Sequence, residues 1–348
     1  MSYYYEYELG KAAKILCEDL FKLKPGETFV ITADTECEKR VIDATATAAF
    51  ACDAKPMVIY TASPLVRGKV GEAMLPFESL TAALLKADAW VGFNGKSMLY
   101  TTICDIAMKE NKMLRFLSLT GMNVDMMVRN IGRVDFPNLE KFMKLVTQKI
   151  LSAKHTRITT SAGTDVDFNS EPGRKVKMHL GYADTLGTHM LAGQISVWPN
   201  FESINGTIVF DGSVDPLGIL KEPVCLTIKK GETVKIEGGK EATEYEKWLK
   251  SFNHPQMLKL AHVSYGFNPG ARLTGFVLED ERVWGATEWG LGNVGHAYGN
   301  FPDGIFGPSH TDGICLNSSV WFDGVQIMDK GHLLDPELKK LAEKSGKV

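Results

Sequence analysis

The sequence predicts an α/β fold in two domains. Residues 1–152 are expected to form a parallel sheet flanked by helices, and residues 153–348 an α+β domain with a mixed or antiparallel sheet. Two observations lead to this prediction. In the first part, short apolar runs alternate with stretches of helical periodicity, which is the pattern of parallel βα units. From residue 155 onward, short strands follow one another with turn residues between them, which is typical of antiparallel pairing.

Each apolar run of the first domain is short enough for a strand and is followed by a helical stretch. The first helix is expected to stop at Lys24-Pro25-Gly26, because proline and glycine end helices. The predicted strands are 27–32, 56–61, 87–94 and 113–120, and the predicted helices are 8–24, 37–53, 79–86 and 101–111. Neither a Gly-x-Gly-x-x-Gly nor a Gly-x-x-x-x-Gly-Lys motif occurs within residues 1–152, so these strands do not predict a nucleotide site.

The second domain is predicted to begin after a linking helix over 138–154. Turn residues at 161–163 and at 229–232 indicate hairpins, and an Asp-Gly pair indicates a final hairpin over 320–327. The other predicted elements are strands at 156–160, 165–168, 175–180, 194–198, 206–210, 224–228 and 233–237, a helix at 241–252, and a charged surface helix from 336.

Composition is that of an ordinary globular protein and excludes several classes of function. The 348 residues carry a formal net charge of −3, so neither nucleic acid nor an anionic membrane surface is an expected partner. No apolar run reaches the roughly 20 residues that span a bilayer. The N-terminus lacks a signal-peptide pattern, so we expect a cytoplasmic protein. The six cysteines form no Cys-x-x-Cys pair, which favours reduced, buried thiols.

The segment 260–312 contains side chains that suit a metal site. His310 and Asp312 stand two residues apart in an extended run, so both point to one face of a strand. His262, in a short apolar run of its own, is the candidate third ligand. Two imidazoles and one carboxylate with open positions form the facial triad that suits ferrous iron in oxygen chemistry. The alternative for the same residues is a capped turn plus a hydrogen-bonded core histidine.

Three further residues are candidates for catalysis. Glu288 stands in an otherwise uncharged run, where it is a ligand, a partner of a ligand histidine, a general base or an exposed strand residue. His189 precedes a predicted strand, and its ordinary pKa of about 6.5 suits it to take a substrate proton at neutral pH. His296 lies in a loop and is the second candidate for that proton.

Aromatic residues near the same segment are candidates for substrate contact. Tyr298 shares a side with His296 if the loop is extended. Trp198, Trp284 and Trp289 are expected either to pack the core or to wall the pocket, and a flat aromatic substrate would favour the second role. Trp198, Trp289 and Tyr298 are therefore predicted to bind substrate.

The second half of the chain also carries a recognisable series of motifs. In order, these are 181–184 (Gly-Tyr-Ala-Asp), 198–200 (Trp-Pro-Asn), 205–209 (Asn-Gly-Thr-Ile-Val), 262–269 (His-Val-Ser-Tyr-Gly-Phe-Asn-Pro), 278–281 (Leu-Glu-Asp-Glu) and 310–312 (His-Thr-Asp). In these motifs the chain resembles the superfamily that joins the M29 (aminopeptidase T-like) metallopeptidases to the 2,5-dihydroxypyridine 5,6-dioxygenases. The resemblance covers most of residues 155–335, and the first domain in architecture only.

The resemblance implies different metal ligands for the two branches. The peptidase branch holds two ions with Glu, Glu, His, Tyr and His-x-Asp. Here Gln194, His262 and Glu288 stand at the first three of those positions, and we expect the neutral amide of Gln194 not to coordinate. The dioxygenase branch holds one ferrous ion with a His and a later His-x-Asp, which His262, His310 and Asp312 match.

The resemblance therefore implies a mononuclear iron(II) enzyme. The expected activity is that of an extradiol-type, ring-cleaving dioxygenase acting on a small dihydroxylated (N-hetero)aromatic such as a dihydroxypyridine. His189 falls where that branch has a pocket histidine, but residues 96–100 contain no histidine where its catalytic base lies. The alternatives are a hydrolase (M29 aminopeptidase-like or amidase) with Zn, Co or Mn and Glu288 as base, and a catalytically silent binding protein. By analogy we expect a homodimer or larger homo-oligomer.

Overall fold

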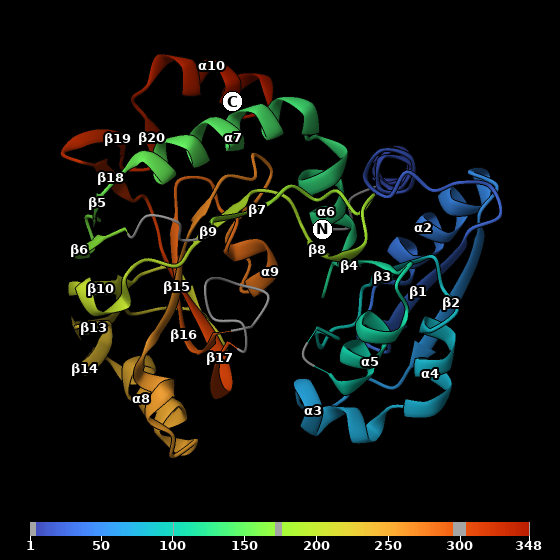
Figure 1. The fold of residues 1–348 in the computed structure, drawn as a ribbon, viewed down its shortest axis with the longest axis horizontal. Helices are drawn as coiled ribbons and strands as arrows, with labels where there is room; N and C mark the ends of the chain where they lie inside the picture. Colours follow the sequence, from blue (N-terminus) through green and yellow to red (C-terminus); the bar gives the residue numbers. More distant parts are fainter. Residues whose placement is uncertain (1–4, 100, 171–175, 295–303, 348) are drawn as a thin grey trace. The chain divides into compact units, whose positions relative to one another are not determined.

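The computed structural model describes residues 5–99, 101–170, 176–294 and 304–347. The chain divides into two compact units (Figure 1): unit 1, Met1–Val134 with His179–Ala192, and unit 2, Asp135–Met178 with Gly193–Val348. This division departs from the predicted boundary at 152/153. Helix α7 (Phe136–Ser152) belongs to unit 2, because its apolar face packs there through Phe142 against Phe267 and Trp284. The segment 179–192 returns to unit 1.

Unit 1 is built on one parallel sheet with the strand order β2-β1-β3-β4-β8. The sequence predicted its first four strands, and the fifth comes from the returning segment. That strand, β8, pairs with β4 so that His189 stands opposite Leu117. The strands are β1 (Thr28–Asp34), β2 (Lys55–Thr61), β3 (Ala89–Gly92), β4 (Arg115–Ser118) and β8 (Gly187–Met190).

Short helices connect these strands. The predicted helix 8–24 is shorter than expected and ends in a π-helical turn, and the predicted helix 79–86 begins two residues earlier. The helices are α1 (Glu6–Lys14), η1 (Ile15–Leu20), α2 (Lys39–Ala51), α3 (Gly68–Gly71), η2 (Glu72–Met74), α4 (Phe77–Leu84), α5 (Thr102–Glu110), α6 (Val124–Met127) and η3 (Val128–Gly132).

The core of unit 1 is centred on two aromatic rings from adjacent strands. Trp90 on β3 stacks on Phe116 on β4, with ring centroids 3.6 Å apart, and both side chains are fully buried. The indole N–H of Trp90 donates to the Thr32 hydroxyl at 2.9 Å, so its single polar group is satisfied in the core. Continuous apolar strands buried on both faces are typical of parallel sheets.

Unit 2 contains two antiparallel sheets. Sheet B has the order β14-β13-β10-β6-β5-β18-β19-β20, and sheet C the order β12-β11-β17-β16-β15-β9-β7. The predicted fold class, a parallel α/β sheet followed by an antiparallel α+β unit, is thereby confirmed. The strands are β5 (His155–Thr159), β6 (Asp165–Asn169), β7 (Val176–His179), β9 (Gln194–Val197), β10 (Asn205–Phe210), β11 (Ser213–Val214), β12 (Gly218–Ile219), β13 (Val224–Lys229), β14 (Glu232–Gly238), β15 (Leu260–Gly266), β16 (Thr287–Val294), β17 (Ile305–Cys315), β18 (Ser319–Phe322), β19 (Val325–Asp329) and β20 (His332–Leu333).

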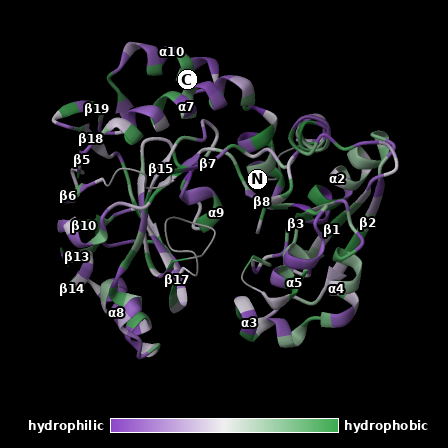
Figure 2. Cartoon of the chain, in the orientation of Figure 1, coloured by the Kyte–Doolittle hydropathy of each residue, from purple (hydrophilic) through white to green (hydrophobic). Residues whose placement is uncertain are grey.

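The helices of unit 2 lie outside the two sheets. Helix α7 packs against the C-terminal helix α10 along the same side of the unit (Figure 1). Helix α8 alternates hydrophilic and hydrophobic residues (Figure 2), and its buried Ala242, Tyr245 and Leu249 follow helical spacing. The helices are α7, η4 (Phe201–Ser203), α8 (Lys240–Ser251), η5 (Pro255–Leu258), α9 (Val277–Asp280) and α10 (Pro336–Lys344).

Two predicted hairpins have the turn chemistry that the sequence indicated. Lys230 and Gly231 join β13 to β14, and Asp323 and Gly324 join β18 to β19. All four residues have positive φ, between 48° and 81°. Two-residue turns with positive φ match the right-handed twist of antiparallel strands, which is why glycine occupies the second position.

Aromatic side chains fill the space between sheets B and C. Trp289 on β16 packs edge-on against Phe168 on β6 at 6.1 Å, and Tyr265 on β15 packs against Phe322 on β18 at 6.4 Å. Because side chains alternate along a strand, the odd-numbered residues of β15 and β16 face this core. The even-numbered residues of those strands face the other side of sheet C, where the candidate site lies.

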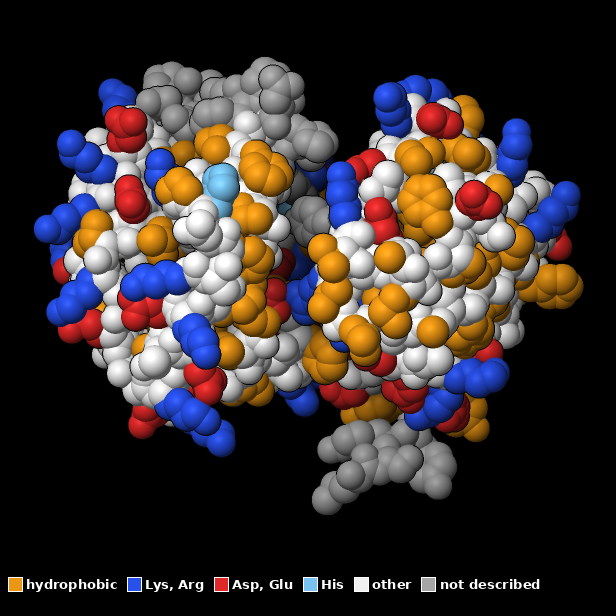
Figure 3. Space-filling view, turned by 90° about the horizontal axis from the view of Figure 1, so that it is seen from below, with side chains coloured by type: hydrophobic (Ala, Val, Ile, Leu, Met, Phe, Trp, Pro, Cys, Tyr) orange, Lys and Arg blue, Asp and Glu red, His pale blue; other side chains and the backbone are white. Residues whose placement is uncertain are grey.

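Exposed apolar side chains gather on unit 1. Figure 3 shows hydrophobic side chains over this unit, the body on the right. Around α3, the strongly exposed apolar residues are Leu65, Val66, Val70 and Met74. Apolar surface of this kind is typical of association sites. Light scattering at micromolar concentration should therefore give at least twice the chain mass of 38.4 kDa, and the mass of a single chain would contradict self-association.

Among the described residues, no helix has the length and hydropathy needed to cross a membrane.

Candidate metal centre

Three neighbouring strands of sheet C carry the candidate ligands. His262 on β15 stands opposite Gly290 on β16, and Gly290 stands opposite Asp312 on β17. His310 precedes Asp312 by two residues and stands opposite Gly292. The strand register thus brings two parts of the chain, some 50 positions apart, to one face of the sheet. Glycine at position 290 of the middle strand leaves room for the His262 ring.

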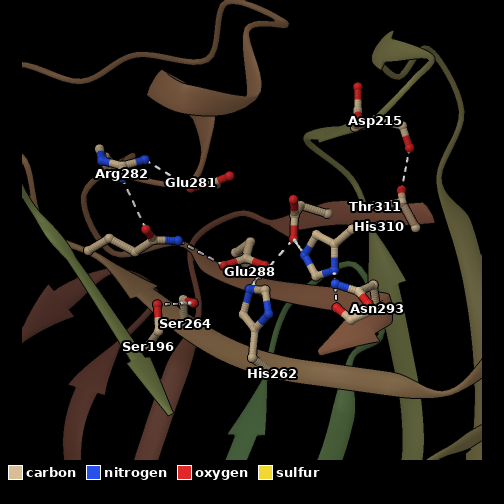
Figure 4. Close-up of polar contacts among 12 residues, drawn as sticks. Ser196, Asp215, His262, Ser264, Glu281, Arg282, Glu288, Asn293, His310 and Thr311 are labelled. Carbon is tan, nitrogen blue, oxygen red and sulfur yellow. Dashed lines mark hydrogen bonds and ion pairs between the residues drawn. The ribbon is translucent and has the colours of Figure 1, made fainter. Parts of the chain in front are cut away.

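The ligating atoms of His262, His310 and Asp312 lie within 4.8 Å of one another. Nε2 of His310 is 3.0 Å from Oδ1 of Asp312, and Nε2 of His262 is 3.5 Å from the same oxygen. The two imidazole rings are nearly parallel, with centroids 5.2 Å apart (Figure 4). Ligand atoms about 2.0–2.2 Å from a common ion are about 3–4.4 Å apart, so these three are close to the spacing of a single-ion site.

The backbone of β16 fixes which nitrogen of His310 carries a proton. Nδ1 of His310 is 2.8 Å from the carbonyl oxygen of Asn293 and donates to it. The neutral ring then presents the lone pair of Nε2 toward Asp312, and two acceptors face each other. A proton or a cation between them removes this repulsion. Burial works against the proton, but the Asp312 carboxylate outweighs it and raises the pKa of His310 to about 9.

Glu288 is a fourth polar side chain on the same face and is almost fully buried. Its Oε2 accepts a hydrogen bond from the Gln194 amide at 3.1 Å. Its Oε1 is 2.7 Å from Nε2 of His262, yet this buried oxygen has no hydrogen-bond partner among the described residues. Burial raises the pKa of Glu288, although His262 acts in the opposite direction. Burial likewise favours a higher pKa for Asp312, but His310 and His262 hold it well below its ordinary value.

A buried chain of hydrogen bonds connects Glu288 through Gln194 and Arg282 to Glu281. The Gln194 amide oxygen accepts from Nη2 of Arg282 at 3.1 Å, and Nη1 of Arg282 donates to Glu281 at 2.9 Å (Figure 4). Arg282 is fully buried and also donates to the Leu278 carbonyl oxygen at 2.6 Å. The sequence singled out neither Arg282 nor Asn293. An arginine after three acidic residues looks like surface charge until the fold buries it.

Gly290 allows the His262 ring to lie directly over the backbone of the middle strand, β16. A Cβ at this position would lie 2.4 Å from Cε1 and 2.5 Å from Nδ1 of His262. Because no real Cβ contact is that short, any side chain here displaces the ring. The sequence did not identify Gly290, since its role becomes visible only once the register of β15 on β16 is known.

Gly290→Ala should therefore weaken divalent-metal binding about 10–100-fold, the range typical for misplaced ligand support. Gly10→Ala is the matched control, because a Cβ there meets nothing within 4 Å. Competition titration of each variant against a chromogenic chelator measures the effect. Wild-type affinity in Gly290→Ala would show that His262 is not held as described.

The remaining predicted site residues have different places. Trp198 lies beside His262, with ring centroids 6.2 Å apart. Trp289 does not reach the site: it packs on Phe168 on the opposite face of sheet C, because it neighbours Glu288 in sequence and strand side chains alternate. His189 lies on β8 of unit 1, with its Nε2 2.8 Å from the Thr185 carbonyl oxygen. The two loop residues predicted to act here, His296 and Tyr298, fall outside the described residues.

The family of the chain follows from comparison with known proteins. The family model for NicX, 2,5-dihydroxypyridine 5,6-dioxygenase, matches residues 16–335, which is most of the chain. The chain belongs to this family. The resemblance stated from the sequence motifs is thereby confirmed.

Individual relatives agree with this assignment. A 2,5-dihydroxypyridine 5,6-dioxygenase of Pseudomonas putida KT2440 is 29% identical over 202 residues, 53% of this chain and 55% of the relative, so the match spans about half of that protein. The solved structure of 2,5-dihydroxypyridine dioxygenase from the same strain superposes with a TM-score of 0.76 at 19% identity, over 96% of this chain and 99% of the other. Wild-type AmpT from Thermus thermophilus gives 0.70 at 13% identity, over 95% and 100%. At these identities the structures show a common fold.

Proposed function

We propose that the chain is a mononuclear non-heme iron(II) dioxygenase of the extradiol type. Its substrate would be a small dihydroxylated aromatic or N-heteroaromatic molecule, such as a dihydroxypyridine, whose ring it opens. The observation that carries the proposal is the convergence of His262, His310 and Asp312 on one face of sheet C, in a chain of this dioxygenase family. Two imidazoles and one carboxylate are the donors of the facial triad.

The residues around the triad fit a divalent cation. The lone pair of His310 Nε2 faces the Asp312 carboxylate, and the buried Oε1 of Glu288 has no hydrogen-bond partner among the described residues. Both arrangements are unfavourable without positive charge between the groups. Nitrogen and oxygen donors without thiolate suit iron(II), and Zn, Co or Mn are the alternatives for the same donors.

The chain's own residues would prepare the site for substrate and dioxygen. Bound iron supplies the redox chemistry that dioxygen needs. His262, His310 and Asp312 would hold the ion through their converging side chains. Asn293 keeps the proton of His310 on Nδ1 and so leaves Nε2 free for the ion. Trp198 is buried in an apolar cluster with Ala261 and Val294 and would support the His262 ring beside it.

A hydrolase that uses two bridged ions is less well supported. Its second ion would require a further anionic ligand beside Glu288. Gln194 stands there instead, with its amide N–H groups directed at Glu288, and the Arg282 guanidinium lies behind it. An amide donor and a fixed cation both disfavour a second metal ion, so this arrangement favours a single ion.

Anaerobic purification followed by reconstitution with iron(II) tests the proposal. We expect one iron per chain and uptake of one dioxygen per molecule of 2,5-dihydroxypyridine, with both atoms of labelled dioxygen in the ring-opened product. Catechol serves as the comparison substrate that lacks the ring nitrogen. A fully iron-loaded protein that consumes no dioxygen with any dihydroxypyridine or catechol would overturn the proposal.

A further inference from the structure

Glu288 has two carboxylate oxygens with different surroundings. It lies on the middle strand of the site, opposite Ser264 and two residues before Gly290. Oε2 is held by the Gln194 amide, whereas Oε1 is directed at the site, 2.7 Å from Nε2 of His262. Two donor atoms bound side by side to one ion are about 3 Å apart. The separation of Oε1 from the His262 nitrogen is close to that value.

The inward oxygen of Glu288 is costly to bury unless positive charge lies beside it. Only about 1% of Glu288 is exposed, and Oε1 has no hydrogen-bond partner within the described part of the chain. Its contact with Nε2 of His262 is an ion pair only when that ring is protonated. Beside a neutral ring, the buried carboxylate oxygen loses hydration without compensation. A divalent ion held by His262, His310 and Asp312 would sit next to this oxygen and restore the missing interaction.

The chain fixes the orientation of this carboxylate from behind. Arg282 has only donors, so the Gln194 atom that faces it at 3.1 Å must be the amide oxygen. The amide nitrogen of Gln194 is then necessarily directed at Oε2 of Glu288. Because the Gln194 amide holds Oε2 in place, Oε1 is the oxygen that would face the ion. Hydrogen bonds from neighbouring side chains commonly orient metal ligands in this way.

Charge balance leads to the same arrangement. Two neutral imidazoles and one carboxylate would leave a divalent ion with a net positive charge in a buried site. The second carboxylate makes the centre neutral, which reduces the cost of burying it. The nearby Arg282 guanidinium does not cancel the negative charge of Glu288, because it pairs with Glu281 at 2.9 Å.

We propose that Oε1 of Glu288 is a fourth protein ligand, so that the substrate-free centre has two histidines and two carboxylates, with Gln194 and Arg282 as positioning residues. The inference rests on the proposed function in one respect, that the triad binds a divalent ion. Four protein ligands would leave two positions on a six-coordinate ion, one for an oxygen of the substrate and one for dioxygen.

Cobalt(II) is a suitable probe, because its affinity and its visible absorption both report on the ligand set. The variants are Glu288→Gln, which keeps the shape and removes the charge, and Gln194→Met, which keeps Glu288 and removes its support. Ser196→Ala is the control: Ser196 is a neighbour on β9 that accepts from the Ser264 hydroxyl at 3.0 Å. Circular dichroism and thermal unfolding establish that each variant is folded.

We expect Glu288→Gln to lower cobalt affinity at least 10-fold and to change the visible spectrum. Gln194→Met should lower affinity by about 10-fold, and Ser196→Ala should leave affinity and spectrum unchanged. If Glu288 only paired with a protonated His262, its loss would make that imidazole easier to deprotonate and would leave cobalt affinity equal or higher. Equal or tighter binding with an unchanged spectrum therefore overturns the inference.

The same titration separates this inference from the proposed function. Wild-type protein that binds no ion would end both. Wild-type protein that binds one ion, together with Glu288→Gln that binds it equally well, would end only the inference. If Glu288→Gln fails to fold, Gln194→Met carries the test, and wild-type affinity in that variant counts against the inference.

Discussion

Replacing His310 by alanine should abolish the binding of one divalent ion per chain, and with it the dioxygenase activity, while the chain keeps its fold. His310 contributes Nε2 to the site, and its Nδ1 is already committed to the Asn293 carbonyl. Without this imidazole, two of the three converging ligand atoms remain. The ring lies at a partly exposed position rather than in the core, so its removal leaves the packing between sheets B and C unchanged.

His332→Ala is the matched control, because His332 is an exposed histidine on β20 in the same unit. Metal per chain after gel filtration, circular dichroism and oxygen uptake are measured for both variants. The control should behave as wild type. If His310→Ala retained one tightly bound ion per chain, the assignment of this residue would be wrong.

Arg282→Ala should destabilise unit 2 by about 3–5 kcal/mol, the range found when one partner of a buried ion pair is removed. The substitution leaves Glu281 buried without its cation and the Gln194 amide oxygen without its donor. Burial, together with the charges of Asp312 and Glu288, already raises the pKa of Glu281 to about 8 even though Arg282 lowers it. Loss of the guanidinium would therefore make a charged Glu281 still less favourable.

Arg157→Ala is the comparison for this effect. Arg157 pairs with Asp165 at the surface of unit 2, with about half of each side chain exposed. Exposed pairs of this kind contribute less than about 1 kcal/mol. The free energies of unfolding of the two variants, measured with denaturant, should therefore differ by several kcal/mol. Similar, small losses in the two variants would mean that the buried network does not support unit 2.

Strand periodicity accounts for what could be predicted of the site. His310 and Asp312 lie on one face because side chains alternate along a strand, and His262 lies on the same face of the sheet, two strands away. The same rule places Trp289 opposite Glu288. These two residues therefore point to different faces of sheet C and do not both line the pocket. The prediction that Trp289 binds substrate is wrong, because its side chain packs on Phe168 in the core.

Other features depend on tertiary contacts that no local pattern contains. The fifth strand of unit 1 is a four-residue segment inserted from later in the chain, and its partner β4 is far away in sequence. Helix α7 has a clear helical pattern, but the pattern does not say which unit its apolar face packs against. Gly290 and Arg282 acquire their roles only from the strand register and from burial around Gln194.

The position of a bound ion in crystals grown with iron(II) tests the central claim most directly. Anomalous scattering at the iron edge should give a single peak per chain, about 2.0–2.2 Å from Nε2 of His262, Nε2 of His310 and a carboxylate oxygen of Asp312. Two peaks bridged through Asp312, or a peak elsewhere with this site metal-free, would contradict the mononuclear centre proposed here.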